Sequence, residues 1–185
     1  MNIRIDNILN IDNIDININK YLNSLKNMDL NIKSNNIIDL FNKLKRNKIN
    51  KGPYSGISLF EAANRIMTDL VILHGVKDLL YGKYENIKFP EYIVEYGNRN
   101  NNKHDIISNF NRKKLIGEAF NVSSSLFQSK KYSSLRKLRK NIDNDTIIIL
   151  MYNKDAIKDN YKHIQNNNEY HIVVNINNIL RHNVV

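Results

Sequence analysis

Downstream of residue 50, the chain alternates between segments with helical spacing of apolar residues and segments typical of strands. The stretch "NKGPYSG" at 50–56 contains glycine and proline, which interrupt regular structure. After it, Ser58 and Glu61 have the spacing of a capping box, and the apolar positions predict a helix over 58–75 that Gly75 can end. Strand-forming residues then predict strands at 92–97, 104–110 and 114–122.

The next part of the pattern is a basic amphipathic segment followed by a strand. Apolar residues recur at helical spacing over 123–140. The stretch "DTIIILMY" at 145–152 is almost wholly apolar, which is typical of a central strand buried on both faces. A short helix around 155–164, a strand at 170–176 and a terminal turn complete the prediction. The order from residue 58 is therefore helix, three strands, helix, strand, which predicts an α/β (α+β) fold.

The N-terminal pattern is less decided. Its apolar positions permit amphipathic helices, although the alternation in "IDNIDININ" also fits a strand; they include Ile8, Ile11, Ile18, Leu22 and Leu25, and then Ile37, Ile38, Leu40, Phe41 and Leu44. We expect one domain over 1–185, a usual size for a single domain. It would comprise a helical segment at 1–55, a core at 58–152, and a helix and strand within 153–185.

Charge and composition indicate which classes of binding partner and which kinds of site the protein can have. Twenty-eight Lys and Arg residues against eighteen Asp and Glu give a net charge of +10, which favours DNA, RNA or acidic membrane surfaces. A basic but otherwise ordinary soluble protein is the alternative. The absence of cysteine excludes disulfides and thiolate zinc sites. Without a signal-peptide pattern or a run long enough to span a bilayer, we expect a cytoplasmic protein with no membrane partner.

Two carboxylates are predicted to face each other across a hairpin. If a tight turn is centred between Asn111 and Arg112, Asp105 lies opposite Glu118 on the same face of the sheet. Strand alternation places Glu118 on an apolar face, where an unpaired carboxylate is costly to bury. A divalent cation with oxygen ligands, such as Mg²⁺, would stabilise the pair. The alternative is a longer turn, which would shift the register by one residue and direct Glu118 to solvent.

The basic helix carries further candidates. Its apolar stripe contains Phe127, Leu135 and Leu138, with Lys131 at the centre. Lys131 either snorkels out of this stripe or reaches the carboxylate pair, where it would stabilise charge on a phosphate or activate water, with Gln128 beside it. The remaining cations either contact a phosphate backbone or form a solvated charged face; they are Lys130, Arg136, Lys137, Arg139 and Lys140.

Other chemistry is weakly represented. The histidines show no metal-ligand spacing, and no glycine-rich phosphate loop is present. His104 adjoins Asp105, but strand alternation directs it to the other face, where it could contact DNA.

This arrangement resembles a known nuclease superfamily. The order helix, strand, strand, strand, helix, strand, with Asp105 on the second strand and Glu118 on the third, is similar to that of PD-(D/E)xK nucleases. "GEAFNVSSSLFQSKKYSSLRKL" followed by "DTIIILMY" looks most like the matching segment of type II restriction endonucleases in the BamHI and BglII neighbourhood. The similarity covers roughly residues 58–152.

The resemblance implies a restriction-endonuclease-like fold, with a central mixed sheet flanked by helices. It implies a type II site-specific deoxyribonuclease that hydrolyses double-stranded DNA with Mg²⁺ and no small-molecule cofactor. A palindromic target would be met by a homodimer, with dimer or base contacts from the N-terminal segment. The implied metal ligands are Asp105, Glu118 and the carbonyl of Ala119. Glu61 matches an auxiliary acidic position, although its capping-box spacing offers a simpler explanation.

One position departs from the family pattern. Phe120 stands where a lysine is usual, and it can neither bind metal nor transfer a proton. Either that role has moved to Lys131, or the site is inactive. The alternatives to a restriction enzyme are therefore a non-catalytic nucleic-acid-binding protein of the same fold and an RNA-cleaving toxin.

Overall fold

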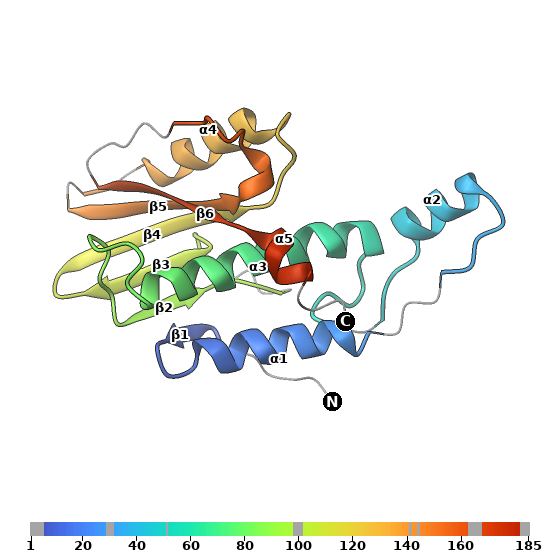
Figure 1. Cartoon of the computed structure of the whole chain (residues 1–185), viewed down its shortest axis with the longest axis horizontal. Helices are drawn as coiled ribbons and strands as arrows, with labels where there is room; N and C mark the ends of the chain where they lie inside the picture. The colour runs from blue at the N-terminus through green and yellow to red at the C-terminus, as the bar shows by residue number, and fades with distance from the viewer. Residues whose placement is uncertain are drawn as a thin grey trace.

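A six-stranded mixed sheet organises the chain (Figure 1). The computed structural model describes residues 6–28, 32–50, 52–97, 102–140, 142–143, 145–162 and 168–181. In sheet order the strands are β1 (Ile8–Asn10), β2 (Glu91–Val94), β3 (Ile106–Phe110), β4 (Lys113–Phe120), β5 (Thr146–Asn153) and β6 (Glu169–Val174). The first four pair antiparallel, whereas β5 and β6 continue the sheet in parallel from β4.

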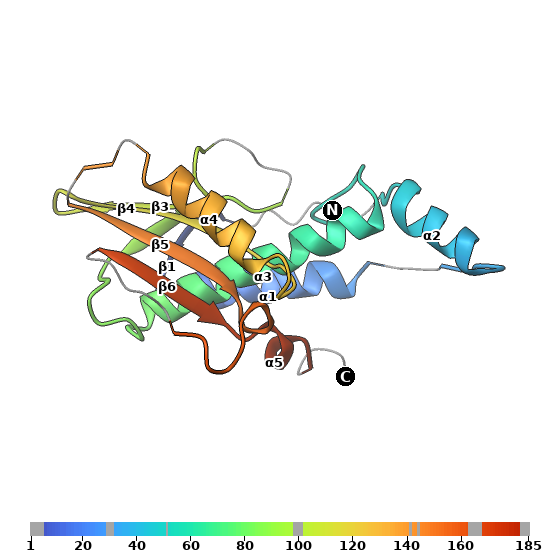
Figure 2. The ribbon, with the colours of Figure 1, turned by 90° about the horizontal axis from the view of Figure 1, so that it is seen from above.

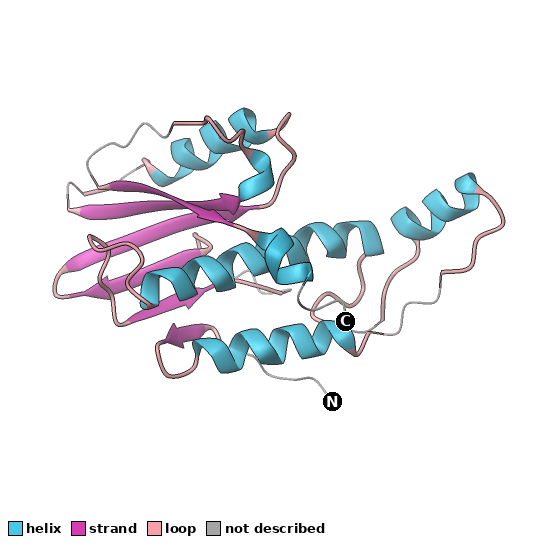
Figure 3. Cartoon of the chain, viewed as in Figure 1, coloured by secondary structure: helices cyan, strands magenta, loops and turns pink. Residues whose placement is uncertain are grey.

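Helices cover both faces of the sheet (Figures 2 and 3). The described α-helices of the chain are α1 (Ile14–Lys26), α2 (Ile37–Arg46), α3 (Leu59–Leu80), α4 (Phe127–Leu138) and α5 (Ile176–Arg181), of which α2 does not pack on the sheet. On one face α3 packs against β4, β5 and β6 with α1 beside it, and on the other α4 packs against β4 and β5. The predicted mixed sheet flanked by helices is confirmed, as is the order helix, three strands, helix, strand from α3 to β5.

Alternation along β4 builds two cores. Leu115 and Ala119 belong to the core shared with α1 and α3, whereas Ile116 and Phe120 belong to the core beneath α4. Glu118, between Ile116 and Phe120 in this alternation, therefore faces α4. Every residue of β5 is buried, as predicted for a central strand.

The long helix α3 was predicted to end at Gly75, but it continues to Leu80. A Cβ on Gly75 would lie 2.4 Å from Sδ of Met151 on β5, so this glycine allows the helix to approach the sheet closely. Near the N-terminus, Ile8 lies in the segment predicted to be helical, and it instead begins strand β1 at the edge of the sheet.

The basic helix and the C-terminal region also differ from the prediction. Residues 124–126 form a turn, so α4 begins at Phe127. A 3-10 turn over Lys154–Ala156 stands where a helix was predicted around 155–164, and residues 163 and 164 of that range lie outside the described part. The predicted terminal turn is the helix α5. None of the described helices has the length and apolar composition that crossing a membrane requires.

Candidate active site

Asp105 and Glu118 lie together at the open end of the hairpin of β3 and β4. The two strands pair from Ile106–Gly117 to Phe110–Lys113, Asp105 directly precedes the first of these pairs, and both carboxylates line one cleft. Asn111 and Arg112 form the connecting turn with φ of 48° and 64°, the left-handed values of a two-residue type I′ turn. The predicted turn and register are therefore confirmed.

Each carboxylate is bound by the protein through one of its two oxygens. Asp105 Oδ2 accepts a hydrogen bond from the N–H of Ala119 at 2.8 Å. Glu118 Oε1 lies 2.7 Å from Nζ of Lys137 and 3.1 Å from Nδ1 of His104. Within the described residues, neither Asp105 Oδ1 nor Glu118 Oε2 has a hydrogen-bond partner. One oxygen of each acid is thus available to a ligand.

The environment of the pair disfavours two negative charges. Burial, and then the charge of Glu118, raises the pKa of Asp105 to about 6, although the N–H of Ala119 and the ammonium of Lys137 oppose this rise. Burial likewise raises the pKa of Glu118 against the lowering effect of Lys137. Since the protein compensates the two charges incompletely, a bound cation would stabilise the ionised pair.

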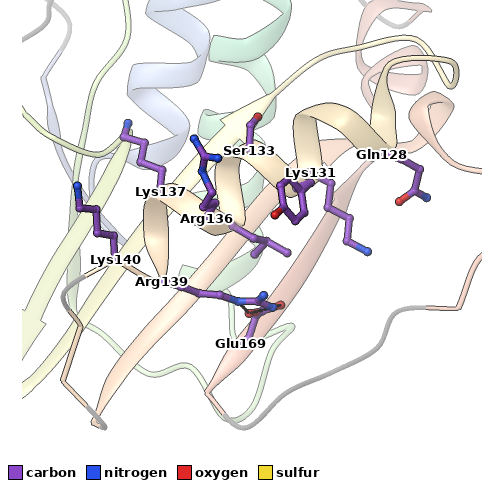
Figure 4. A pocket seen from close by; sticks show the side chains of 10 residues that line it. Gln128, Lys131, Ser133, Arg136, Lys137, Arg139, Lys140 and Glu169 are labelled. Atoms are coloured by element: carbon purple, nitrogen blue, oxygen red, sulfur yellow. Dashed lines mark hydrogen bonds and ion pairs between the residues drawn. The ribbon is translucent and has the colours of Figure 1, made fainter.

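Lys137, and not Lys131, reaches the carboxylates from α4. Nζ of Lys131 donates a 2.6 Å hydrogen bond to the hydroxyl of Tyr161 and lies over its ring. In Figure 4 the side chains of Lys131 and Lys137 point away from each other. The prediction that Lys131 reaches the pair is wrong, because its stripe faces the core and its ammonium leaves by snorkelling. Lys130, seven residues before Lys137, shares the flank that lines the cleft.

Phe120 occupies the strand position at which the family pattern has a lysine, and Lys137 of α4 reaches Glu118 instead. Its ring stacks on Tyr152 with centroids 5.6 Å apart and lies 6.2 Å from the ring of Phe127. Phe120 is therefore a core residue between β4 and α4. Because Glu118 lies on the same face of β4 as Phe120, it faces α4, and a side chain from α4 can reach its carboxylate.

A cleft of about 580 Å³ contains the carboxylate pair. Its walls come from α3, the segments flanking β2 and β3, the end of β4 and α4. Among the described residues, four cationic side chains line it, namely Arg65, Lys103, Lys130 and Lys137. A cleft lined by both acids and cations is suited to an anionic substrate that binds together with a metal ion.

Asp69, in the middle of α3, is a further acid of this cleft that sequence analysis missed. Its Oδ2 accepts hydrogen bonds from the hydroxyls of Tyr21 at 2.6 Å and Tyr54 at 2.7 Å, and from the N–H of Gly97 at 3.2 Å. Burial raises the pKa of Asp69 to about 7 despite these hydrogen bonds. The available signal was a lone acid inside the apolar run "IMTDLVIL".

Glu61 lies in the exposed first turn of α3, two turns before Asp69. Its N–H donates to Oγ of Ser58 at 3.2 Å, which confirms Ser58 as the helix cap. Its carboxylate pairs with Arg65 at 2.7 Å, in a contact half exposed to solvent. The structure does not bring Glu61 to the carboxylate pair.

His104 was predicted to point to the opposite face of the sheet from Glu118, but it contacts Glu118. Residues 102–105 form bends and do not extend β3, so strand alternation does not apply to them. Burial lowers the pKa of His104, and the charges of Lys137 and Lys103 lower it further. Nδ1 of His104 lies 3.1 Å from Oε1 of Glu118, and it donates this hydrogen bond whenever the carboxylate is ionised, because an ionised carboxylate can only accept. His104 therefore fixes the position of Glu118.

The other basic residues of α4 and of the segment directly after it border a larger groove of about 1050 Å³, which Glu169 of β6 also lines (Figure 4). Arg136 and Lys140 line this groove. Arg139 also lines it, but its guanidinium binds the buried Glu169 of β6 with three hydrogen bonds of 2.8 to 3.0 Å. Arg139 is therefore engaged within the protein.

The donor set of the cleft fits Mg²⁺. Within the described residues, no group of three or more His, Cys, Asp or Glu side chains could hold a metal ion. Mg²⁺ is commonly bound by one or two carboxylates, with water and substrate phosphate completing its coordination. Asp105 and Glu118, each with an available oxygen, match that demand, whereas a zinc site needs three or four protein ligands. The carbonyl of Ala119 as a ligand stays a prediction.

No protein-family model, curated protein or solved structure matches the chain. Its function is therefore inferred from the residues of the cleft.

Proposed function

We propose that the protein is a Mg²⁺-dependent endonuclease that hydrolyses phosphodiester bonds in double-stranded DNA. The observation that carries this proposal is that Asp105 and Glu118 line one cleft and interact electrostatically, with Nζ of Lys137 2.7 Å from Oε1 of Glu118. The order of elements from α3 to β5 supports a restriction-endonuclease-like fold. The net charge of +10 favours a polyanionic substrate.

The proposed chemistry assigns a separate task to each residue of the cleft. Asp105 and Glu118 hold the metal through their available oxygens. When bound, Mg²⁺ supplies a water of lowered pKa and neutralises charge on the phosphate. The Lys137 ammonium stabilises the negative charge that develops on the phosphate, because it lies beside the metal ligand Glu118. His104 keeps Glu118 oriented.

The basic surface around the cleft would hold the DNA backbone. Lys130 lies in the cleft, and Arg136 and Lys140 line the adjoining groove. These three are therefore the strongest candidates for contacts to phosphates flanking the scissile one. Arg139 is a weaker candidate, because such a contact would compete with its bond to Glu169.

Site-specific type II cleavage by a homodimer is the finer form of the proposal. The N-terminal segment, proposed to supply dimer or base contacts, includes α2, which buries none of its residues. Ile37, Ile38 and Phe41 are all more than half exposed on this helix, which stands apart from the sheet in Figures 1 and 2.

A cleavage assay tests the proposal. Plasmid, bacteriophage DNA and total RNA are incubated with the protein in Mg²⁺ or EDTA. We expect DNA cleavage that EDTA abolishes and that is lost in Asp105→Asn and in Glu118→Gln. Lys137→Met is expected to reduce cleavage by about 10²- to 10³-fold, the usual loss on removing one charge-stabilising group. The matched control, Lys131→Met, removes a lysine from the same helix and should cleave like the wild type.

A non-catalytic DNA-binding protein is the second candidate. It is favoured by the ion pair of Glu118 with Lys137, which neutralises that carboxylate without a metal. Metal-independent DNA binding without cleavage would support it. RNA fragments with intact DNA would instead indicate an RNA-cleaving toxin.

A further inference from the structure

A small cavity lies beside the cleft, with Lys103 lining both and His104 lining the cavity. Its volume is about 190 Å³. Isoleucine side chains and the buried Thr146 contribute to its lining, with Lys103, Lys114, Lys140, His104 and Asp143 around them. At about 30 Å³ for each water, the cavity could hold roughly six water molecules. It is therefore smaller than pockets for drug-sized ligands, which begin near 300 Å³.

The charges around this cavity select an anion. Of the described residues, three lysines and one aspartate line it, and together they carry a formal charge of +2 with His104 neutral. His104 is 8% exposed, and its Nδ1 is committed to Glu118. Its other ring nitrogen, Nε2, has no hydrogen-bond partner in the described part of the chain. A compact oxyanion would meet ammonium donors here that have no ion-pair partner among the described residues.

The cavity and the cleft are adjacent. Lys103 lines both of them, and His104, which lines the cavity, contacts Glu118 in the cleft. A chain of phosphates that places one phosphate at Asp105 and Glu118 must place its neighbours close by. The cavity is the cationic hollow on the His104 side of that position.

We propose that this cavity binds a second phosphate group, the one adjacent to the scissile phosphate on the same strand. The assignment to a neighbouring phosphate rests on the proposed nuclease function, whereas the binding of a phosphate anion does not. The substrate is thus a polynucleotide strand held at two successive phosphates. Cleavage of the strand therefore depends on the phosphate next to the scissile one, and a simple phosphodiester has no such second phosphate.

Lys114→Met tests this idea against a matched control. Lys114 lines the cavity, whereas Lys113, adjacent to it on β4, borders a different hollow near the hairpin turn. Both lysines are exposed, so Lys113→Met makes the same change of charge outside the cavity. The two variants are compared on an oligonucleotide duplex and on bis(4-nitrophenyl) phosphate, a diester with no neighbouring phosphate.

We expect Lys114→Met to lower kcat/KM for the duplex by about tenfold, the loss for one charge-assisted phosphate contact. Its kcat/KM for bis(4-nitrophenyl) phosphate should stay equal to that of the wild type, and Lys113→Met should leave both values unchanged. Equal losses on the two substrates, or equal effects of the two variants on the duplex, would overturn the proposal.

Phosphate binding in EDTA separates this inference from the nuclease function. Inorganic phosphate is titrated into the metal-free protein and followed by ³¹P NMR. We expect saturable binding that Lys114→Met combined with Lys140→Met abolishes and Lys113→Met preserves. That result without DNA cleavage would sustain the anion site and refute the nuclease. Cleavage without phosphate binding, or binding that the double variant retains, would refute the anion site and leave the nuclease standing. Melting temperatures establish that each variant is folded.

Discussion

Asp69→Asn removes a buried ionisable group and retains the shape of its hydrogen-bond network. The amide oxygen can take the place of Oδ2, which accepts from Tyr21, Tyr54 and Gly97. The amide nitrogen then takes the place of Oδ1 and can donate to the hydroxyl oxygen of Tyr54, 2.8 Å away. The variant should therefore fold, and the comparison isolates the effect of ionisation.

The expected magnitude follows from the pKa of Asp69. Burial raises it from 3.8 to about 7. At about 1.4 kcal/mol for each unit, ionising this acid in the folded protein costs about 4 kcal/mol. A raised pKa means that the folded state binds the proton more tightly. The contribution of protonated Asp69 to stability is therefore complete below the unfolded pKa and is lost as the pH rises through the folded pKa.

Urea unfolding of both proteins from about pH 4 to about pH 8 measures this loss. The free energy of unfolding of the wild type, relative to Asp69→Asn, should fall by about 4 kcal/mol over that range, with most of the fall complete by about pH 7. Other titrating groups largely cancel in the difference. A difference that does not change with pH would contradict the raised pKa, because Asp69 would then have an ordinary pKa in the folded protein.

Three further changes test the packing and the hairpin. Gly117→Ala should destabilise the protein by about 1–3 kcal/mol in urea unfolding, because the new Cβ would lie 2.4 Å from Cγ1 of Ile149; wild-type stability would contradict this. Arg139→Ala should lower the free energy of unfolding by about 2 kcal/mol, since it leaves the buried Glu169 without its guanidinium partner; the cost stays below that of a fully buried pair because Arg139 is 48% exposed. Arg112→Gly should raise the melting temperature, by a gain of up to about 1 kcal/mol, because φ of 64° favours glycine; a lower melting temperature would count against the type I′ turn.

Periodicity and turn chemistry sufficed for the hairpin and its carboxylates. The turn at Asn111 and Arg112 sets the register, and the register places Asp105 and Glu118 at the same end of the hairpin, directly beyond the Ile106–Gly117 pair. These are local relations, because the partners lie within one hairpin and each strand alternates regularly. The same holds for β5, whose burial on both faces follows from its apolar run.

Relations between distant segments were not accessible in this way. The lysine that reaches Glu118 depends on how α4 is rotated on the sheet, and the aromatic core around Phe120 and Tyr152 fixes that rotation. His104 escaped prediction because the backbone bends before β3. Asp69 is held by tyrosines 48 and 15 residues away in the sequence, and no local pattern reveals such contacts.

The central claim is that Asp105 and Glu118 share a divalent cation. Crystals soaked in Mn²⁺, which replaces Mg²⁺ at oxygen sites and scatters anomalously, test it most directly. If the two carboxylates share the ion, one anomalous peak should lie within bonding distance of both Asp105 Oδ1 and Glu118 Oε2, and it should disappear in Asp105→Asn. Side chains that remain as described, with Lys137 on Glu118 and no anomalous peak in the cleft at saturating Mn²⁺, would contradict it.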